Sequence, residues 1–85
     1  MKSLTTPDFW IAYAKLPLNI QQKARKAYQR WQENPSHPSL HFKKVGKNLW
    51  SVRITQNYRA LALKKGDDDY WVWIGTHDEY ELFLS

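Results

Sequence analysis

The sequence predicts a single α+β domain, residues 1–85, in which two helices pack on one face of an antiparallel sheet of about four strands. Three observations predict this fold class. Apolar residues recur at helical spacing in the first part of the chain, and the period changes to two from Leu40 onward. Short turns rich in Gly, Asn and Asp separate the later segments. Five Trp, five Tyr and three Phe offset the small size of the chain, because each buried aromatic side chain removes a large apolar area from water.

The first helix is expected to begin after Thr6, which can cap it, and Pro7 suits the first helical position. Pro17 ends this short helix and opens a second one, which Asn34 and Pro35 stop. The second helix carries a single apolar stripe, which consists of Ile20, Ala24, Ala27, Tyr28 and Trp31. Four cations lie off the stripe: Lys23, Arg25, Lys26 and Arg30. The stripe therefore predicts the face that packs on the sheet.

The expected strands are residues 40–45, 50–55, 58–64 and 70–74, with turns at 46–48, 56–57 and 66–69. The last strand is aromatic and β-branched throughout, which is typical of a central strand buried on both faces. We expect Trp71 and Trp73 to lie under the two helices. The three aspartates at 67–69 are expected in a solvated hairpin tip. Because both helices precede the strands, the other face of the sheet is predicted to be open.

The charge is distributed unevenly along the chain, although the net value is only +5. Residues 1–66 hold all 13 Lys and Arg against only Asp8 and Glu33, a net charge of +11. Residues 67–85 hold six acidic residues and no Lys or Arg, a net charge of −6. A basic body of this kind attracts RNA or an acidic protein partner, and its excess is larger than solubility requires.

Composition also excludes several classes of protein. The absence of Cys excludes a disulfide framework and a thiolate metal site. No apolar run approaches the roughly 18 residues that a membrane span requires. The start of the chain, residues 1–7, lacks the apolar core of a secretory signal. We therefore expect a cytoplasmic protein with no membrane partner, no metal and no small-molecule cofactor.

The run from His77 to Tyr80 follows the last strand, at a position where working groups are often presented. His77 can exchange protons near neutral pH, and Tyr80 can donate a proton or stack on a base. Adjacent His, Asp and Glu in an extended chain point to opposite faces, so a metal site is a weak interpretation. The residues alone are equally consistent with a functional site and with a polar turn that caps the sheet.

Arg53 and Arg59 flank the predicted hairpin turn at residues 56–57. Each guanidinium could bind a phosphate, or it could form a cross-strand ion pair with one of the later carboxylates. A two-residue turn places Arg59 opposite Ile54 and the two arginines on different faces, whereas a three-residue loop places them on one face. The sequence leaves both arrangements open.

Lys43 and Lys44 lie on the first long strand. They could hold a phosphate backbone through sequence-independent contacts. Charged residues on an edge strand also prevent association between sheet edges, and this interpretation is at least as well supported.

Several short motifs in order resemble the RelE/ParE toxin superfamily, whose members are toxins of type II toxin–antitoxin modules. They are Thr5-Thr6-Pro7-Asp8-Phe9, Lys15-Leu16-Pro17, Asn34-Pro35-Ser36-His37-Pro38-Ser39-Leu40, Trp50-Ser51-Val52-Arg53-Ile54-Thr55, Tyr58-Arg59-Ala60-Leu61 and Gly75-Thr76-His77-Asp78-Glu79-Tyr80. Each motif is short, and it is the ordered set, from Thr5 to Tyr80, that is specific. The resemblance implies two helices packed on a twisted four-stranded antiparallel sheet, with a concave basic cleft opposite.

RelE-like members of this superfamily are ribosome-dependent, metal-independent endoribonucleases, so the resemblance implies an mRNA interferase that is controlled by an antitoxin. Arg59 would stabilise the pentacoordinate phosphate formed when a 2′-hydroxyl attacks it. His77 would transfer a proton, and Tyr80 would stack on a base or share that role. Lys43, Lys44 and Arg53 would hold the RNA backbone. The ParE-like branch shares the fold, inhibits DNA gyrase and needs no nuclease site, which implies a non-catalytic binding module as the alternative.

Two features of this chain differ from the superfamily pattern. The segment Met1–Thr5 is short and polar where the superfamily has a clear first strand. The carboxylates of Asp78, Glu79 and Glu81 surround His77 in the sequence and would repel a phosphate, so in an active cleft they have to point away. Pairing of Arg59 with Glu79 or Glu81 would favour the binding module.

Overall fold

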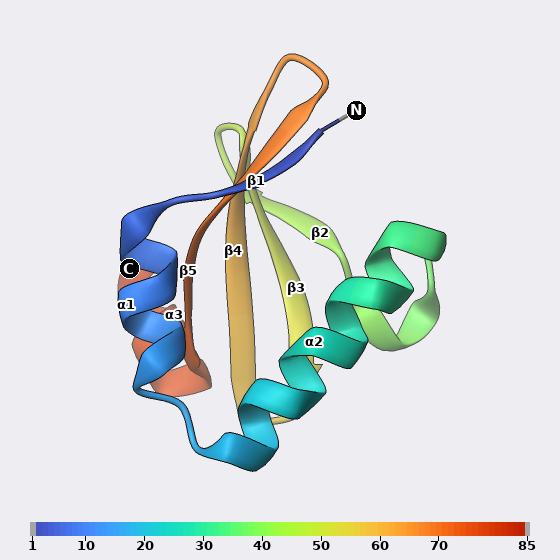
Figure 1. Cartoon of the computed structure of the whole chain (residues 1–85). Coiled ribbons are helices and arrows are strands. Elements are labelled where there is room, and N and C mark those ends of the chain that lie inside the picture. The colour runs from blue at the N-terminus through green and yellow to red at the C-terminus, as the bar shows by residue number, and fades with distance from the viewer. Residues whose placement is uncertain (1, 85) are drawn as a thin grey trace.

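The computed structural model of the chain describes residues 2–84 and confirms the α+β class (Figure 1). The elements follow in the order β1 (Ser3–Thr5), α1 (Pro7–Ala14), α2 (Leu18–Glu33), the 3-10 helix η1 (Pro38–Leu40), β2 (Lys43–Gly46), β3 (Leu49–Thr55), β4 (Tyr58–Lys65), β5 (Asp68–Thr76) and α3 (His77–Leu84). Thr6 caps α1 as predicted, because its side chain accepts a hydrogen bond from the backbone N–H of Phe9. Within residues 2–84, no helix is long and apolar enough to cross a membrane.

The sheet has five strands in the order β1-β5-β4-β3-β2. The four strands predicted from the sequence form an antiparallel meander, and β1 pairs in parallel with β5 at one edge. Figure 1 shows α1 and α2 in front of the sheet, with the β4–β5 hairpin extending beyond both helices. The sheet therefore has one strand more than the predicted four, and this additional strand, β1, is parallel rather than antiparallel to its neighbour.

β1 has no alternating pattern in its sequence and owes its strand conformation to β5. The backbone N–H of Asp69 donates to the carbonyl of Lys2 at 2.8 Å, and that of Thr6 donates to the carbonyl of Trp71 at 3.1 Å. The indole Nε1 of Trp71 also donates to the hydroxyl of Ser3 at 2.9 Å. The open edge of β5 thus selects the conformation of this polar segment, whose first residue, Met1, lies outside the described residues.

The core lies between α2 and the front face of the sheet, and it contains the predicted stripe. Ile20, Ala24, Ala27 and Trp31 are buried, and Trp31 packs edge-to-face on Trp71 at 5.1 Å between ring centroids. Tyr28 lies at the margin of the stripe and is 37% exposed. From the sheet, the buried residues of this core are Val52, Ala60, Ala62, Trp71 and Ile74. The small alanines of β4 leave room for the two indoles, and the other buried residues of this core are aliphatic.

Trp73 does not lie under α1 and α2 as expected, because β5 contains a bulge. Trp71 lies opposite Ala62 and Trp73 lies opposite Leu61, so Val72 is an extra residue without a partner on β4. The extra residue places Trp71 and Trp73 on opposite faces, and Trp73 packs on Phe83 of α3 at 4.9 Å between centroids. β5 is an interior strand, flanked by β1 and β4, but several of its side chains remain half-buried, so the predicted burial on both faces holds only in part.

The prediction that Asp69 lies in a solvated hairpin tip is wrong. Its side chain is fully buried. Only residues 66 and 67 form the turn, and Asp69 lies within the sheet between Ser3 of β1 and Lys64 of β4. Within residues 2–84, neither of its carboxylate oxygens makes a hydrogen bond. Burial raises the pKa of Asp69, while the charge of Lys64 acts in the opposite direction.

The third helix, α3, was not predicted, and it packs on the face that was expected to be open. The hydroxyl of Tyr80 donates to Ser51 of β3, and Phe83 packs on Trp73 of β5. The segment satisfies the capping pattern Ser/Thr-x-x-Glu with Thr76 and Glu79, a helix-start signal that was available in the sequence. α3 therefore covers part of this face and leaves part of it open.

Gly75 is required by close packing at the end of β5. A Cβ atom at this position would lie 2.3 Å from Cζ2 of Trp73, the ring that packs on α3. We expect Gly75→Ala to lower the free energy of unfolding by about 1–3 kcal/mol, because the ring of Trp73 would have to move away from Phe83. Urea denaturation monitored by Trp fluorescence measures this loss.

Gly46→Ala is the matched control, since its added Cβ would have its nearest neighbour, Cβ of Leu49, at 3.5 Å. This variant should change the free energy of unfolding by less than about 0.5 kcal/mol. Equal losses in the two variants would show that the packing of Trp73 over Gly75 is not tight.

Candidate functional site

The β3–β4 hairpin places Arg53 and Arg59 on the same face of the sheet. The turn has two residues, as predicted, but Ile54 is an additional residue in β3 that has no partner on β4. Arg53 is consequently paired directly with Arg59, and Thr55 is paired with Tyr58. The bulge, which no pattern in the sequence indicated, decides between the two arrangements that the sequence left open.

The two arginines face each other without a neutralising carboxylate. Within residues 2–84, neither guanidinium makes an ion pair, so the proposed cross-strand pairing with Glu79 or Glu81 does not occur. Burial lowers the pKa of Arg59, the charge of Arg53 lowers it further, and Tyr80 acts in the opposite direction. Like charges directly opposite each other destabilise a sheet, and a bound anion would remove that repulsion.

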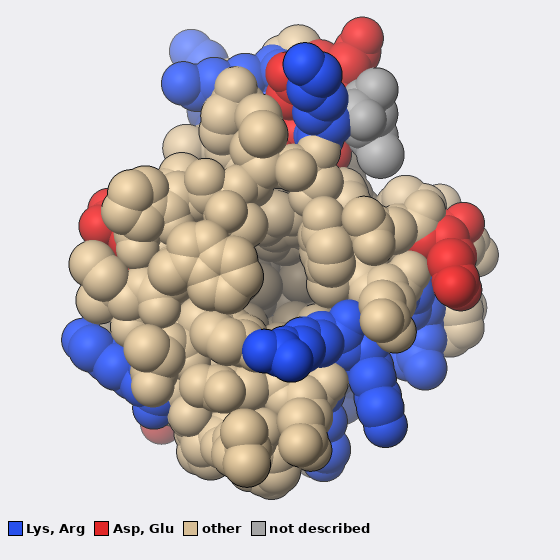
Figure 2. Space-filling model, viewed as in Figure 1, with Lys and Arg blue, Asp and Glu red and all other residues tan. Residues whose placement is uncertain are grey.

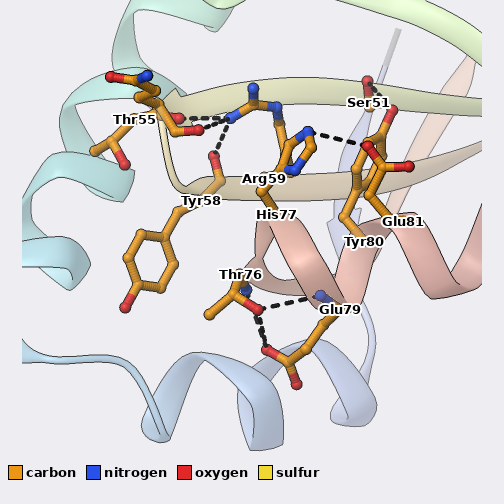
Figure 3. A network of polar contacts seen from close by, with 10 residues as sticks. Ser51, Thr55, Tyr58, Arg59, Thr76, His77, Glu79, Tyr80 and Glu81 are labelled. Atoms are coloured by element: carbon orange, nitrogen blue, oxygen red, sulfur yellow. Dashed lines mark hydrogen bonds and ion pairs between the residues drawn. The ribbon is translucent and has the colours of Figure 1, made fainter.

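The guanidinium of Arg59 is held at the hairpin turn by three backbone carbonyls (Figure 3). Its Nη1 donates to the carbonyl oxygens of Thr55, Gln56 and Tyr58, the last two at 3.2 and 3.0 Å. Within residues 2–84, Nε and Nη2 make no hydrogen bond. One side of the guanidinium is thus fixed and the other remains available for a ligand.

The first turn of α3 brings His77 and Tyr80 to the same end of the sheet. The backbone N–H of His77 donates to the carbonyl of Asn57 at 2.7 Å, in the turn that also holds Arg59. The His77 side chain is 39% exposed, whereas Tyr80 is only 5% exposed and its hydroxyl contacts Ser51 at 3.4 Å. The two rings lie 5.7 Å apart. His77 is accessible to a ligand, and Tyr80 supports it from the interior.

The carboxylates around His77 point in different directions (Figure 3). Glu79 turns back to Thr76, whose backbone N–H and hydroxyl donate to Oε1 at 3.1 and 2.9 Å, and it faces the groove beside Lys15 of α1. Glu81 instead approaches His77, with 3.4 Å between Oε1 and Nε2. The expectation that the carboxylates point away therefore holds for Glu79 and not for Glu81.

Lys43 and Lys44 lie on opposite faces of the sheet. Lys43 is paired with Ser51 and so shares the face of the arginines, whereas Lys44 is paired with Trp50 on the face that α2 covers. His41 was not among the candidates predicted from the sequence, and its Nε2 lies 3.3 Å from Nη1 of Arg53. His41 adopts a left-handed backbone conformation with φ of 46°, a local feature that the alternating pattern around it concealed.

The resulting site, which we call the arginine site, consists of Lys43, Arg53, Arg59 and His77. It combines three cations with one accessible imidazole at the open end of the sheet face that α3 partly covers. Within residues 2–84, no group of three or more His, Asp or Glu side chains is placed to hold a metal ion. Such an arrangement can bind a phosphodiester, and its imidazole can exchange a proton with a hydroxyl group beside it.

Comparisons with known proteins bear on the family and the fold of the chain. The sequence profile of the ParE-like toxin domain family matches residues 18–82. A comparison with curated protein sequences finds no significant match.

Solved structures of toxins share the fold. The RelB-RelE antitoxin-toxin complex from Methanococcus jannaschii contains a chain with a TM-score of 0.76 and 18% identity, which covers 96% of this chain and 99% of its own. A YoeB/ParE toxin from Agrobacterium tumefaciens has a TM-score of 0.69 and 18% identity, over 91% of this chain and 99% of its own. The YoeB dimer from Staphylococcus aureus has a TM-score of 0.68 and 13% identity, over 91% and 97%. At these identities the likeness shows the fold.

The cap formed by Glu79 should make the stability of the protein depend on pH. The hydrogen bonds from Thr76 hold the pKa of Glu79 below its ordinary value of 4.5. The unfolded chain thus binds this proton more readily, so the stabilisation is present above about pH 4.5 and is lost as the pH falls through the lower folded pKa. We expect Glu79→Gln to lower the free energy of unfolding at pH 7 by a few tenths to about 1 kcal/mol.

Urea denaturation at pH 7 and at pH 3 measures this difference, which should become small at pH 3. Asp78→Asn is the control, since Asp78 is an exposed acid in the same turn that does not cap Thr76. A deficit of Glu79→Gln that stayed constant between the two pH values would contradict the assignment of the cap to the ionised carboxylate.

Proposed function

The chain belongs to the ParE-like toxin domain family, within the RelE/ParE superfamily of toxins of toxin–antitoxin systems, and we propose that it is a ribosome-associated endoribonuclease. In this proposal it cleaves mRNA by attack of a 2′-hydroxyl on the adjacent phosphate. The observation that carries the proposal is the pair of arginines that face each other without a carboxylate, next to an accessible histidine. A gyrase-binding surface does not require an imidazole beside two unneutralised guanidinium groups.

Arg59 is the residue best suited to stabilise the transition state. The attacking 2′-oxygen forms a bond to phosphorus while the bond to the 5′-oxygen breaks, and negative charge accumulates on the phosphoryl oxygens. The guanidinium is already oriented by three carbonyls, so its free edge needs no reorganisation to donate to those oxygens. Arg53 and Lys43, on the same face, would hold the neighbouring phosphates.

His77 is suited to accept the proton of the 2′-hydroxyl. Its Nε2 faces the carboxylate of Glu81, which favours the tautomer with the proton on Nε2 and leaves Nδ1 as the base. The 5′-oxygen must receive a proton as it leaves, and water at this exposed end of the sheet would supply it. From the sequence, Tyr80 was expected to stack on a base or to share the proton transfer. Because Tyr80 is buried and contacts Ser51, we assign it to the positioning of His77.

An antitoxin is the proposed protein partner, and a hollow in the surface suits it. Figure 2 shows a depression lined by uncharged residues between α1 and α2, with Lys and Arg gathered along its lower and right margins. The hollow measures about 510 Å³ and its walls include Phe9, Trp10, Tyr13, Tyr28 and Trp71. An amphipathic acidic segment would fit both the apolar floor and the basic margin. One similar toxin was solved in a RelB-RelE antitoxin-toxin complex.

The alternative function is that of a non-catalytic module that binds DNA gyrase. Two observations favour it: the family profile that matches is the ParE-like one, and α3 buries Tyr80 and covers part of the sheet face. This alternative predicts DNA breaks that depend on gyrase, together with intact mRNA.

Inducible expression of the protein tests the two functions. We expect the wild type to halt translation and to cleave ribosome-bound mRNA, and Arg59→Ala to lower the cleavage rate by about 100-fold or more, because it removes the donor to the transition state. Mapping of mRNA 5′ ends and measurement of translation give the two readouts.

Lys65→Ala, which removes a cation at the far end of β4, serves as the control and should keep full activity. Full toxicity of Arg59→Ala would rule out the assigned role of Arg59. DNA breaks that depend on gyrase, together with intact mRNA, would show that the protein is the binding module and not a nuclease.

A further inference from the structure

A second group of cations lies where α2 passes the end of β3. A cavity of about 460 Å³ opens there, between α2, the loop after η1 and the β3–β4 turn. Its walls include Lys23, Lys26 and Arg30 from α2, together with His41 and Arg53. We call this cavity the α2 pocket. No Asp or Glu lines it, so its electrostatic potential is that of an anion site.

The three α2 cations form a line along one edge of the helix. They follow the spacing i, i+3, i+7 beside the apolar stripe and extend over roughly 10 Å of the helix axis. Glu33, at the last position, is the only acidic residue of α2, and within residues 2–84 none of the three cations makes an ion pair. Like charges at this spacing weaken a helix by a few tenths of a kcal/mol per pair, which an anionic ligand would offset.

Arg53 connects the α2 pocket to the arginine site. Its backbone lies opposite Arg59, and its side chain lines the pocket and contacts His41. This is possible because β2 pairs with β3 only as far as Ser51, so the β3 edge beyond that point is open. The cationic surface is therefore continuous from Arg59, around the β3 edge, to α2.

The chemistry of the pocket fits a phosphodiester backbone. The Arg30 guanidinium is partly ordered by a hydrogen bond from Nη1 to the hydroxyl of Ser39 at 3.0 Å. No Phe, Tyr or Trp side chain that could stack on a base lines the pocket, and its one ring, that of His41, contacts Arg53. Cations without base-reading groups position a nucleic acid strand independently of its sequence.

We propose that the α2 pocket binds the backbone of the same RNA strand that the arginine site cleaves, several nucleotides from the scissile phosphate. This inference rests on the proposed nuclease function for the identity of the ligand. The pocket acts as an anchor that fixes the direction of the strand across the β3 edge.

The test uses the full chain with Arg59→Ala as background, so that RNA remains intact, and a fluorescently labelled single-stranded 12-mer RNA as the probe. We expect Lys26→Gln/Arg30→Gln to weaken binding by about 20-fold at 0.1 M salt and to reduce the salt slope by about 1.4, since each phosphate contact on a single strand contributes about 0.7. The loss should be the same for 12-mers of different sequence. Fluorescence anisotropy over a salt series measures both quantities.

Lys15→Gln/Lys65→Gln removes the same charge at two exposed positions away from the pocket. It should leave the slope and the affinity close to those of the background. Equal losses in both double variants would overturn the proposal, because they would reflect net charge alone. Loss of binding to a poly-glutamate 10-mer with unchanged RNA binding would also overturn it, and would show a surface for an acidic protein.

The RNA-binding role of the α2 pocket and the nuclease function can be tested separately. If the wild type leaves ribosome-bound mRNA intact while RNA binding still depends on the α2 pocket, this result would support the anchor and rule out the nuclease function. Cleavage by the wild type, with RNA binding that does not depend on the pocket, would do the reverse. Circular dichroism of each variant confirms that the exposed substitutions, which keep good helix formers in α2, leave the fold unchanged.

Discussion

In the β3–β4 hairpin, Ile54 has no cross-strand partner, and this single extra residue determines which side chains share a face of the sheet. Before the bulge, Val52 and Ala60 are paired and buried under α2. Their neighbours Arg53 and Arg59 are paired on the opposite face, where α3 and the open edge of β3 lie. Because side chains alternate with a period of two, the hydrophobic core and the cationic face are fixed by the same register and cannot vary independently.

The two faces are stabilised in different ways. The front face gains apolar burial and edge-to-face aromatic contacts, with Trp31 and Trp71 at its centre. The back face carries the paired residues Arg53 and Arg59, whose guanidinium groups have no carboxylate partner within residues 2–84. Apolar burial on one side thus offsets electrostatic repulsion on the other, which is common where a protein retains unneutralised charge for binding.

The sequence predicted the elements whose signals are local. The Thr6 cap, the apolar stripe of α2 and the two-residue turn before Tyr58 all formed as expected, because neighbouring residues determine them. β1 and the bulges in β3 and β5 depend on partners distant in the chain, and these have no local signature. The start of α3 at His77 was missed for a different reason: its capping pattern is local, but it was interpreted as an extended polar cluster.

The same distinction applies to the site. Arg53, Arg59 and His77 could be proposed from residue type and order, but their common face depends on the bulge at Ile54. The contact between His41 and Arg53 depends on the left-handed backbone conformation of His41, in the loop after η1. Tyr80 was proposed as accessible, and its burial follows from a helix that the strand-based interpretation did not include.

α3 has only eight residues, a length at which an isolated helix is marginal in water. It is held by the Thr76 cap, by the bond from His77 to Asn57 and by two rings, Tyr80 and Phe83. Its opening would leave the α2 core intact, so the helix can form a local unfolding unit of its own. The geometry around His77 then depends on the opening equilibrium of α3, and a variant with an unchanged melting temperature could lose the arrangement of the arginine site through this helix alone.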